Sequence, residues 1–436
     1  MDVIRVHSVT LNKEKCKGCT ACIKNCPTEA IRVRDGKAQI IDEICIDCGE
    51  CIRVCPYYAK IAVTDPLEKI YDFKYKIALP APTLYGQFKG LKDINKVLYG
   101  LLSLGFDDVY EVAKGADYTS AYIRRYMKEE NIKKPAISSA CPSIARLIQV
   151  RFPELIEHIV PIDSPMEMAS ELAKNEFSKK HNVDKKDIGT FFITPCPAKM
   201  TAVKNPIGKD KSSLDGAISI IDIYGRLVNA LNIKVPFKED FKRASSYGVS
   251  WASSSGEANS LNIDKYLAVD GIKNVIKVLE EIENNNISDL DFLECLSCTG
   301  GCVGGPLTFE NGYVCKNRIS RISKTLEKTF LDESDILKNE DEISWKYTKE
   351  IKANAGMKLD SNIVESLKMM EEIKKIKERL PGLDCGACGS PTCTALAEDI
   401  VKGEAKENDC VYILREEVQD LKRQLNNLNL DKRGDK

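Results

Sequence analysis

Histidine and long apolar runs are scarce in this sequence, and each shortage excludes a class of protein. Its 436 residues include 3 histidines, His7, His158 and His181, which stand singly and far apart. A metal site built on imidazole is therefore not expected. No apolar run is long enough to cross a bilayer, and the first residues lack the charged-then-apolar pattern of an export signal. We expect a soluble, cytoplasmic protein.

An excess of charge of either sign is also missing. The chain carries 64 lysines and arginines against 65 aspartates and glutamates, and no basic block stands out. Nucleic acids and anionic membrane surfaces attract proteins through clustered positive charge. The balance therefore predicts neither a nucleic-acid partner nor a membrane partner.

Cysteine, by contrast, is abundant, with 18 residues. In a small secreted domain this number would indicate disulfides. In a long chain without an export signal it favours metal ligands in a reducing compartment. The cysteines gather in distinct groups along the chain, so each group is a separate candidate site.

Two tandem cysteine runs lie within residues 10–60. Each has the spacing Cys-x2-Cys-x2-Cys-x3-Cys-Pro, which is typical of the two-cluster bacterial ferredoxin, where the fourth cysteine of each run binds the other cluster. Zinc sites do not explain two such runs. One [4Fe-4S] cluster is assigned to Cys16, Cys19, Cys22 and Cys55, and the other to Cys26, Cys45, Cys48 and Cys51.

From Tyr75 on, apolar strands alternate with helical patterns. The predicted elements are strands at 76–80, 108–112, 135–138 and 189–193 and a helix at 91–102. Such alternation indicates parallel α/β layers with the site at the carboxyl ends of the strands. Cys141 and Cys196 stand just after two of these strands.

Another pair of cysteines completes a set of four. Cys298 and Cys302 stand four apart beside glycines, which let a backbone approach a bulky inorganic body closely. With Cys141 and Cys196 they supply four thiolates, the number that holds one cubane. Cys295 is a less favoured substitute for Cys298, because the Cys-x3-Cys spacing and the glycines that follow favour Cys298. The alternative is a set of structural cysteines that happen to lie near glycines.

The segments around Cys141, Cys196 and Cys298 resemble, in this order, the three signature motifs of the active-site domain of [FeFe]-hydrogenases. The resemblance covers most of residues 75–325 and implies two α/β lobes with a metal centre in the cleft between them. Besides the cysteines, it rests on Pro142, Arg146, Phe152, Pro153, Glu154, Ser164, Pro165, Lys199 and Glu294.

The resemblance also implies a cofactor, the H-cluster, which joins a [4Fe-4S] cubane to a two-iron subcluster with carbonyl, cyanide and azadithiolate ligands. Cys141, Cys196, Cys298 and Cys302 would hold the cubane, and Cys302 would bridge to the subcluster, where the family splits or forms H2. Lys199 would donate to a cyanide. The protein would fix the cofactor, deliver electrons and manage protons.

Several positions depart from the family pattern. The cysteine that usually passes protons to the cofactor is Ala140, and an alanine cannot relay a proton. The other replaced positions are Thr194 and Leu296 for methionines, Ala202 for a glutamate, and Tyr122, Ile123 and Tyr126 on the usual proton path. This combination resembles the proposed sensor branches of the family.

Protons therefore need another route, for which two glutamates are candidates. Glu294 stands four before Cys298, so a helix there would place both on one face. Glu257 resembles the glutamate of a Gly-rich family segment. A relay carboxylate needs a raised pKa, which burial supplies. The alternative for both is a salt-bridged structural acid.

The C-terminal part has a different texture. A charged stretch after residue 331 predicts a solvated helical connector, and Asp360 and Ser361 are expected to cap an amphipathic helix that stops at Pro381. A further cysteine set follows, whose spacing resembles the small [4Fe-4S] module of corrinoid iron-sulfur proteins, with structural zinc as the alternative. Its members are Cys385, Cys388, Cys393 and Cys410.

The chain ends in a heptad seam formed by Leu414, Val418, Leu421, Leu425 and Leu428. About two heptads are too short to be stable alone. The seam is therefore expected to join two chains into a homodimer or to dock a partner helix, although packing on its own body is the alternative.

These features together predict an α/β protein built from several domains. They are a ferredoxin-like 2[4Fe-4S] domain at 1–66, a two-lobed α/β H-cluster domain at 67–330, a helical connector at 331–380, a [4Fe-4S] module at 381–411 and a short coiled-coil tail at 412–436.

Three functions fit this organisation. The leading hypothesis is an [FeFe]-hydrogenase, an oxidoreductase that interconverts H2 with protons and electrons at low turnover and reports H2 or redox state to a signalling protein. The second is a metabolic hydrogenase that exchanges electrons with ferredoxin. The third is a non-enzymatic hydrogenase-like iron-sulfur protein without the two-iron subcluster. The first two require maturation proteins that insert the subcluster.

Overall fold

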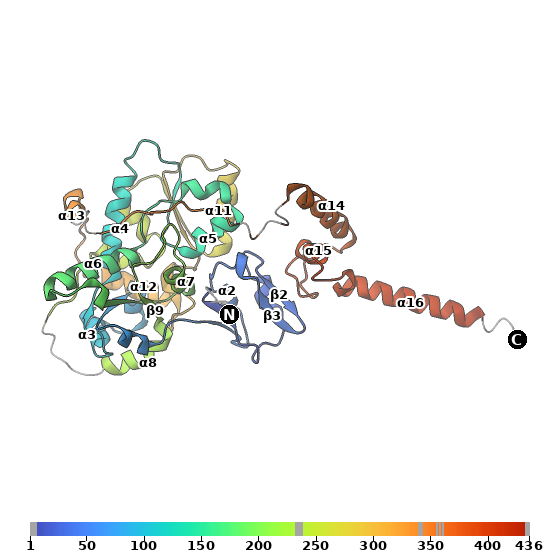
Figure 1. The fold of residues 1–436 in the computed structure, drawn as a ribbon, viewed down its shortest axis with the longest axis horizontal. Coiled ribbons are helices and arrows are strands. Elements are labelled where there is room, and N and C mark those ends of the chain that lie inside the picture. The colour runs from blue at the N-terminus through green and yellow to red at the C-terminus, as the bar shows by residue number, and fades with distance from the viewer. Residues whose placement is uncertain are drawn as a thin grey trace. The chain divides into compact units, whose positions relative to one another are not determined.

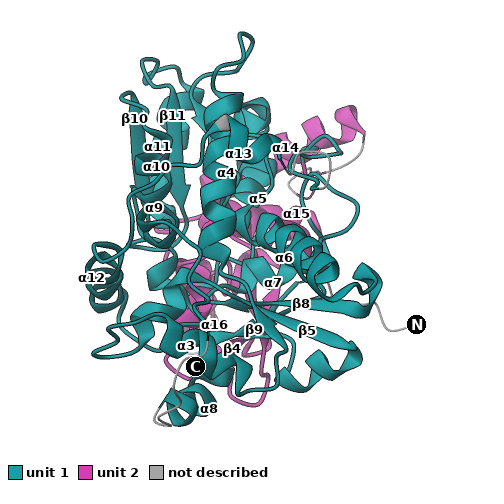
Figure 2. Ribbon diagram, turned by 90° about the vertical axis from the view of Figure 1, so that its left-hand side faces the viewer, with its two compact units in different colours: residues 1–9, 46–49, 62–353 teal, residues 10–45, 50–61, 354–436 magenta. Residues whose placement is uncertain are grey.

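The computed structural model describes residues 7–231, 239–338, 343–354, 356, 359 and 362–431. The chain divides into two compact units, coloured separately in Figure 2. Unit 1 consists of residues 1–9, 46–49 and 62–353, and unit 2 of residues 10–45, 50–61 and 354–436. Among the described residues, no helix is both long and apolar enough to cross a bilayer.

Unit 1 contains a four-stranded parallel sheet with the order β6-β5-β8-β9. Its strands are Asp108–Val109, Tyr75–Pro80, Ile188–Thr194 and Gly216–Ser219, in that order. All seven residues of β8 are buried, as expected for a central strand whose two faces are both covered. The strands predicted at 76–80 and 189–193 are confirmed, whereas the one predicted at 108–112 ends at Val109.

A second parallel sheet in unit 1 has the order β10-β11-β7. Its strands are Tyr266–Asp270, Phe292–Leu296 and Ala136–Ile137. The central strand β11 is buried along its whole length and places Glu294 opposite Ala268 of β10. The two sheets confirm the predicted mixed α/β class with parallel strands.

Helices surround both sheets (Figure 1). They are α3 (Asn95–Leu102), α4 (Val112–Tyr126), α5 (Pro142–Arg151), α6 (Pro165–His181), α7 (Pro197–Lys204), α8 (Ile220–Leu231), α9 (Ser246–Ser250), α10 (Gly256–Leu261), α11 (Ile272–Glu283), α12 (Gly312–Ser323) and α13 (Glu333–Leu337). The helix predicted at 91–102 begins only at Asn95.

The core of unit 1 lies on both faces of the first sheet. Successive residues of a strand point to opposite faces. Accordingly, Ile77 and Leu79 of β5 belong to one hydrophobic cluster, and Ala78 belongs to the other. Phe192 and Phe191 of β8 divide in the same way. A strand buried on both faces reads as a continuous apolar run, which is why the sequence revealed it.

Part of the predicted helical connector belongs to the core of unit 1. Ile336 and Ile343 are buried within the same cluster as Ile77, and Trp345 stacks on Tyr122 with ring centroids 4.6 Å apart. Within the described residues between 331 and 354, only α13 is helical. The prediction of a solvated connector was wrong here because a few apolar side chains outweigh the surrounding charges.

Unit 2 contains the antiparallel hairpin of β2 (Ile31–Arg34) and β3 (Lys37–Ile40). Its helices are α1 (Ala21–Lys24), α2 (Glu50–Arg53), α14 (Ile363–Arg379), α15 (Cys393–Val401) and α16 (Val411–Asp431). The remaining short strands of the chain are β1 (Val9–Leu11) and β4 (Lys60–Ala62).

The cap of α14 is Asn362, whose side chain accepts a hydrogen bond from the Val364 amide at 2.9 Å. Asp360 and Ser361, the predicted caps, lie outside the described residues. Of the predicted apolar stripe, only Ile373 and Ile376 within α14 are buried, against α15.

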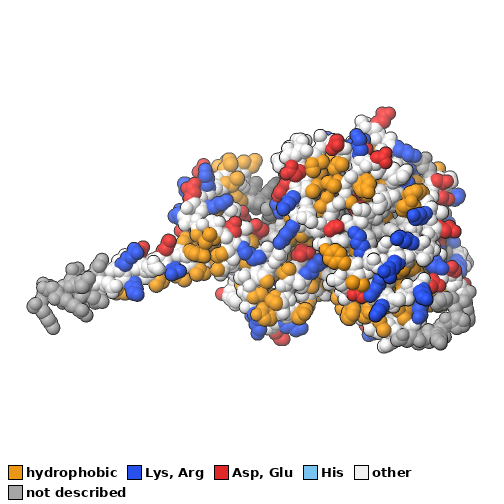
Figure 3. Space-filling model, turned by 180° about the vertical axis from the view of Figure 1, so that it is seen from behind, with side chains coloured by type: hydrophobic (Ala, Val, Ile, Leu, Met, Phe, Trp, Pro, Cys, Tyr) orange, Lys and Arg blue, Asp and Glu red, His pale blue; other side chains and the backbone are white. Residues whose placement is uncertain are grey.

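The apolar seam of α16 is exposed. Val411, Leu414, Val418, Leu421 and Leu425 each keep between 44% and 60% of their surface accessible. Hydrophobic side chains are visible along this helix in Figure 3. These five positions therefore do not pack on the body of their own chain.

Candidate metal centre and its cavities

Four cysteines of unit 1 converge at the ends of strands. Cys141 and Cys196 are the residues before α5 and α7, and Cys298 and Cys302 follow β11. Burial raises the pKa of Cys196, and negative charge on the other three thiols raises it further, while Lys199 lowers it. The structure thus brings together the predicted cubane ligands and Lys199.

The loop that carries Cys298 and Cys302 needs glycine at Gly301. This residue has φ +96°, and a Cβ atom there would lie 2.7 Å from the Ser254 amide nitrogen. Only glycine accepts both the backbone angle and this contact. The loop therefore lies against the chain just before α10.

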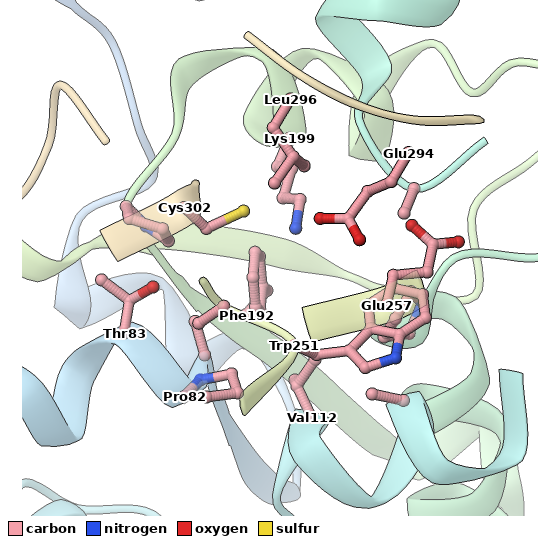
Figure 4. Close-up of a pocket in the computed structure, with 16 residues that line it drawn as sticks. Pro82, Thr83, Val112, Phe192, Lys199, Trp251, Glu257, Glu294, Leu296 and Cys302 are labelled. Carbon is pink, nitrogen blue, oxygen red and sulfur yellow. The ribbon is translucent and has the colours of Figure 1, made fainter. Parts of the chain in front are cut away.

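Beside the thiols lies a cavity with about 530 Å³ of free space, part of it open to solvent (Figure 4). Its wall comes from both sheets and the helices between them. The residues that bear on its chemistry are Thr83, Ala140, Lys199, Trp251, Glu257, Glu294, Leu296 and Cys302.

Lys199 extends its amine into this cavity, between Cys302 and Glu294 (Figure 4). Burial alone would lower the pKa of Lys199. The nearby thiols, Cys302 first among them, outweigh burial, and the pKa is raised. The side chain therefore presents a charged N–H donor to the cavity.

Glu294 lies on strand β11, so the helical placement considered from its spacing to Cys298 is not realised. Its two carboxylate oxygens accept hydrogen bonds from the Ser255 amide at 2.9 Å and the Ala258 amide at 2.8 Å. Burial nevertheless raises the pKa of Glu294, and the charge of Asp270 adds to the rise.

Glu257 stands in the first turn of α10 and reaches the first cysteine motif. Its Oε2 atom accepts a hydrogen bond from Ser138 Oγ at 2.5 Å, whereas its Oε1 atom has no hydrogen-bond partner among the described residues. Burial raises its pKa, and the charge of Glu294 raises it further. Neither glutamate forms an ion pair within the described chain, and the two amide contacts of Glu294 also brace the chain at the start of α10.

Two wall residues were not foreseen from the sequence. The buried Oγ1 atom of Thr83 has no hydrogen-bond partner within the described ranges and lines the cavity. Trp251 is held by hydrogen bonds from its Nε1 to Ser120 and Ser260, both at 2.9 Å. Thr83 follows the carboxyl end of β5, where residues of parallel sheets commonly line a site, so its position along the sequence could have identified it.

The replaced family positions have distinct surroundings. Ala140 and Leu296 lie in the cavity wall. The hydroxyl of Thr194 instead accepts a hydrogen bond from the Cys196 amide at 3.1 Å and so braces the chain before α7. Ala202 lines a second cavity, on the Ser139 side of the first motif.

This second cavity contains its own acid pair, Asp163 and Glu167, with Lys209 as counterion. The Lys209 amine lies 2.5 Å from Asp163 Oδ2 and 3.9 Å from Glu167 Oε2. Burial raises the pKa of Asp163 to about 7, against the effect of Lys209. Glu167 also accepts from Ser212 Oγ at 2.5 Å and from the Ser213 amide at 2.7 Å.

In unit 2, one of the two ferredoxin-type sets is assembled. Cys16, Cys19, Cys22 and Cys55 line a single cavity with about 330 Å³ of free space. Backbone amides donate to the sulfur atoms of Cys16 and Cys55, from Ala38 at 3.4 Å and from Ala59 at 3.2 Å. This arrangement agrees with the crossed ligand pattern. The second set, Cys26, Cys45, Cys48 and Cys51, remains a prediction.

The terminal set also gathers in unit 2. Burial raises the pKa of Cys388, and charge on Cys410 and Cys385 raises it further, so these thiols are neighbours. Cys393 begins α15, and its amide donates to Asp384 Oδ1 at 2.6 Å.

The donor sets fit the groups that the sequence implies. Four clustered thiols suit a cubane. The adjoining cavity offers a cationic donor, Lys199, and an unpartnered hydroxyl, Thr83, for polar ligands of a second group. Cys295 and Cys315 are buried and line neither this cavity nor the ferredoxin one.

Three family models match the chain. The iron only hydrogenase large subunit, C-terminal domain, matches residues 74–262 and 241–306. The 4Fe-4S dicluster domain matches residues 8–56, and an Fe-S cluster family matches residues 380–412.

Curated relatives agree with these matches. The chain is 27% identical over 369 residues to the periplasmic [Fe] hydrogenase large subunit of Nitratidesulfovibrio vulgaris, an overlap of 70% of this chain and 87% of that protein. It is 24% identical over 376 residues to iron hydrogenase 1 of Clostridium pasteurianum, covering 69% of this chain and 65% of that protein, just under two thirds.

Solved structures share the fold. An [FeFe]-hydrogenase, HydA(deltaEFG), matches with a TM-score of 0.51 and 14% identity over 66% of this chain and 98% of its own. A variant of HydA1 from Chlamydomonas reinhardtii matches with a TM-score of 0.50 and 15% identity, with the same coverage of each chain. The chain therefore belongs to the iron-only hydrogenase large-subunit family and carries iron-sulfur domains on both sides of its hydrogenase domain.

Proposed function

We propose that this protein is an [FeFe]-hydrogenase of low turnover that reports H2 or redox state to a partner. The observation that carries the proposal is the cavity lined by Cys302, Lys199, Glu257 and Glu294, with the unpartnered Thr83 hydroxyl in its wall. The free space of this cavity, beside four thiols that suffice for one cubane, leaves room for a second group, and Lys199 and Thr83 provide donors for its polar ligands.

Cys141, Cys196, Cys298 and Cys302 would hold the cubane, and Cys302 also lines the cavity that would take the two-iron subcluster. When bound, the subcluster would supply the site at which H2 is split or formed. Lys199 and Thr83 would bind and orient its polar ligands, and Trp251 and Phe192 would limit the access of water.

Protons at this site would be handled by Glu257 and Glu294. A carboxyl group whose pKa is raised toward neutrality both accepts and releases a proton at working pH. Burial raises the pKa of each glutamate, and the Oε1 atom of Glu257 has no hydrogen-bond partner among the described residues. Ser138, bonded to Glu257, extends this network to the first motif.

Electrons would pass between the metal centre and the [4Fe-4S] clusters of the flanking domains, and then to ferredoxin or a signalling protein. The ferredoxin segment also supports a metabolic, ferredoxin-linked hydrogenase as the second candidate. The absence of a proton-relaying side chain at Ala140 favours the low-turnover sensor over that candidate. Abundant metal-binding thiols suit a reducing, cytoplasmic compartment.

The test is metal analysis and H2 turnover of the matured protein. Four cubanes and a two-iron subcluster require roughly 18 iron atoms per chain. About 14 iron atoms with zinc would assign Cys385, Cys388, Cys393 and Cys410 to a zinc site. Infrared bands of metal-bound carbonyl and cyanide, with slow H2 oxidation and evolution, are expected. Their complete absence after maturation would favour the non-enzymatic alternative.

We also propose that α16 joins two chains in parallel. Extended back to Val411, the seam has Val411, Val418 and Leu425 at a positions and Leu414 and Leu421 at d positions. β-branched residues at a with leucine at d favour two strands in parallel coiled coils, and two of these three a positions are β-branched. In that register Glu417 at g faces Lys422 at e of the second copy. Exposure of the apolar seam leaves it open to such a partner.

Removal of the residues after Tyr412 should therefore halve the solution mass while H2 turnover stays nearly unchanged. Light scattering of the matured protein measures the mass. Glu417→Lys should weaken the dimer by like charge, and Glu417→Lys combined with Lys422→Glu should restore it. A monomeric full-length chain would contradict the dimer.

A further inference from the structure

The terminal four-cysteine module is tied to the ferredoxin hairpin by a buried ion cluster inside unit 2. Asp399 of α15 accepts from Arg32 Nε at 3.0 Å and 2.7 Å, one bond to each oxygen, and from Arg34 Nη2 at 2.6 Å. Ser390 Oγ donates to the same carboxylate at 2.7 Å. The side chains of Asp399 and Arg32 are only 3% and 9% exposed. A buried carboxylate with paired arginines and a hydroxyl has its charge fully compensated.

A backbone contact lies beside the ion cluster. The Val33 amide of β2 donates to the Gly389 carbonyl at 2.7 Å, and Arg34 Nη1 donates to the Cys388 carbonyl at 3.3 Å. Gly389 has φ +85°, and a Cβ atom there would lie 2.0 Å from the Val33 carbonyl oxygen. The terminal loop therefore fits against β2 only with glycine at this position.

Val33 also lines the cavity of Cys16, Cys19, Cys22 and Cys55. Cys388 is thus linked to that cavity by the peptide bond to Gly389, one hydrogen bond, and Val33. Val33 lines the ferredoxin cavity, Gly389 follows Cys388 in the chain, and one hydrogen bond joins these two residues. Only Val33 and Gly389 therefore stand between the cavity and Cys388.

We propose that the terminal module is a docked extension of the ferredoxin relay, and that the Asp399 cluster positions it for electron transfer across the Gly389–Val33 contact. One electron at a time passes between the group held by Cys385, Cys388, Cys393 and Cys410 and the group held by Cys16, Cys19, Cys22 and Cys55. One group is oxidised as the other is reduced. The inference rests on the iron-sulfur sites of the proposed function.

Asp399→Asn in the full-length holoprotein tests the docking. Hydrogen exchange at the Val33 amide should lose protection by roughly a hundredfold, the scale for removing one partner of a buried ion pair. The control is Glu407→Gln, which breaks the exposed Arg379–Glu407 pair of the same module and should leave Val33 protected. Unchanged protection in Asp399→Asn would overturn the docking.

Gly389→Ala gives a second test that leaves all charges in place. Its control is Gly403→Ala, because Gly403 has a similar φ of +75° but no atom within 4 Å of the added Cβ. Both variants carry the same backbone strain, yet only Gly389→Ala should expose Val33 to exchange.

Electron paramagnetic resonance of the dithionite-reduced protein tests the electron path. The wild type and Gly403→Ala should show a spin-spin interaction between the terminal and ferredoxin clusters, which Gly389→Ala should lose with its iron content intact. Equal spectra in both variants would overturn the path. Zinc bound by the terminal cysteines would also overturn the electron path, while the protection of the Val33 amide would stay unchanged. H2 turnover does not depend on either result, so a failure of the electron path can be told apart from a failure of the proposed hydrogenase function.

Discussion

Two cavities flank the first cysteine motif in unit 1, and each contains a pair of buried acids and one lysine. In the first cavity, Glu257 and Glu294 form no ion pair with a described residue, and Lys199 faces the thiols. In the second, Lys209 lies within 4 Å of both Asp163 and Glu167. The two cavities contain the same types of residue. Among the described residues, only the lysine of the second cavity forms ion pairs with the acids.

Raised pKa values and an unpartnered oxygen occur in both cavities, since burial raises the pKa of Glu257, Glu294 and Asp163, and Glu257 Oε1 and Asp163 Oδ1 have no hydrogen-bond partner among the described residues. The cavities differ in the counterion, which only the acids of the second cavity have among the described residues. Acids paired to a buried lysine instead fix the segments that carry them, because breaking the pair leaves uncompensated charge. We therefore expect the acid pair of the first cavity to act as a proton relay and the pair of the second cavity, with Lys209, to act as a structural lock.

The largest effect is expected from breaking the lock with Lys209→Met. The change leaves Asp163 and Glu167 buried without a cation and should lower the free energy of unfolding by about 3–5 kcal/mol at neutral pH. A carboxyl with a raised pKa stabilises the fold when protonated and loses that contribution as pH rises. The deficit should therefore shrink toward pH 5. Thermal unfolding of both proteins at several pH values measures this loss of unfolding free energy. A loss that does not change with pH would contradict a structural role for the ion pairs of Lys209.

The relay is broken by Glu294→Gln, which should reduce H2 turnover by roughly a hundredfold, the scale of a lost general acid or base. Its infrared carbonyl and cyanide bands should not change. The matched control is Glu167→Gln, another buried glutamate with two donors, which should keep turnover near wild type. Near-normal turnover in Glu294→Gln would exclude this relay.

A smaller, pH-dependent effect is expected for Asp163→Asn. The pKa of Asp163 is raised to about 7. Its contribution to stability is therefore complete below its ordinary pKa and is lost as pH rises toward 7. The variant lacks this loss, so the fall in stability across that window should flatten. Denaturation at several pH values checks it, and parallel curves for both proteins would show that Asp163 does not titrate there.

The smallest effect is expected for Ala140→Cys. The new thiol would enter the wall of the first cavity, next to the metal centre. The glutamates of the family's usual path are absent, so a thiol alone has no partner to pass protons onward. H2 turnover should rise little. A large gain, measured on the matured variant, would mean that the usual path is still open.

The sequence predicted the parts of the site that lie close together along the chain. Cysteine spacing pointed to groups of thiols, of which the structure brings together Cys141, Cys196, Cys298 and Cys302, and Cys16, Cys19, Cys22 and Cys55. Continuous apolar runs identified β5 and β8. It failed for Glu294, since a short apolar stretch is compatible with either helix or strand. It also missed contacts between distant segments, such as Lys209 with Asp163 and Arg32 with Asp399, which are 46 and 367 positions apart. Such pairs depend on packing, and no local pattern records them.

The two proline-initiated helices beside the thiols have a further consequence. α5 and α7 begin directly after Cys141 and Cys196, so the amino-terminal ends of both helices lie at two of the four clustered thiols, the candidate metal centre. The aligned peptide dipoles place a partial positive charge at each of these ends. The backbone itself therefore provides a standing electric field that favours negative charge at the centre. Side-chain substitutions in the cavity leave that field in place.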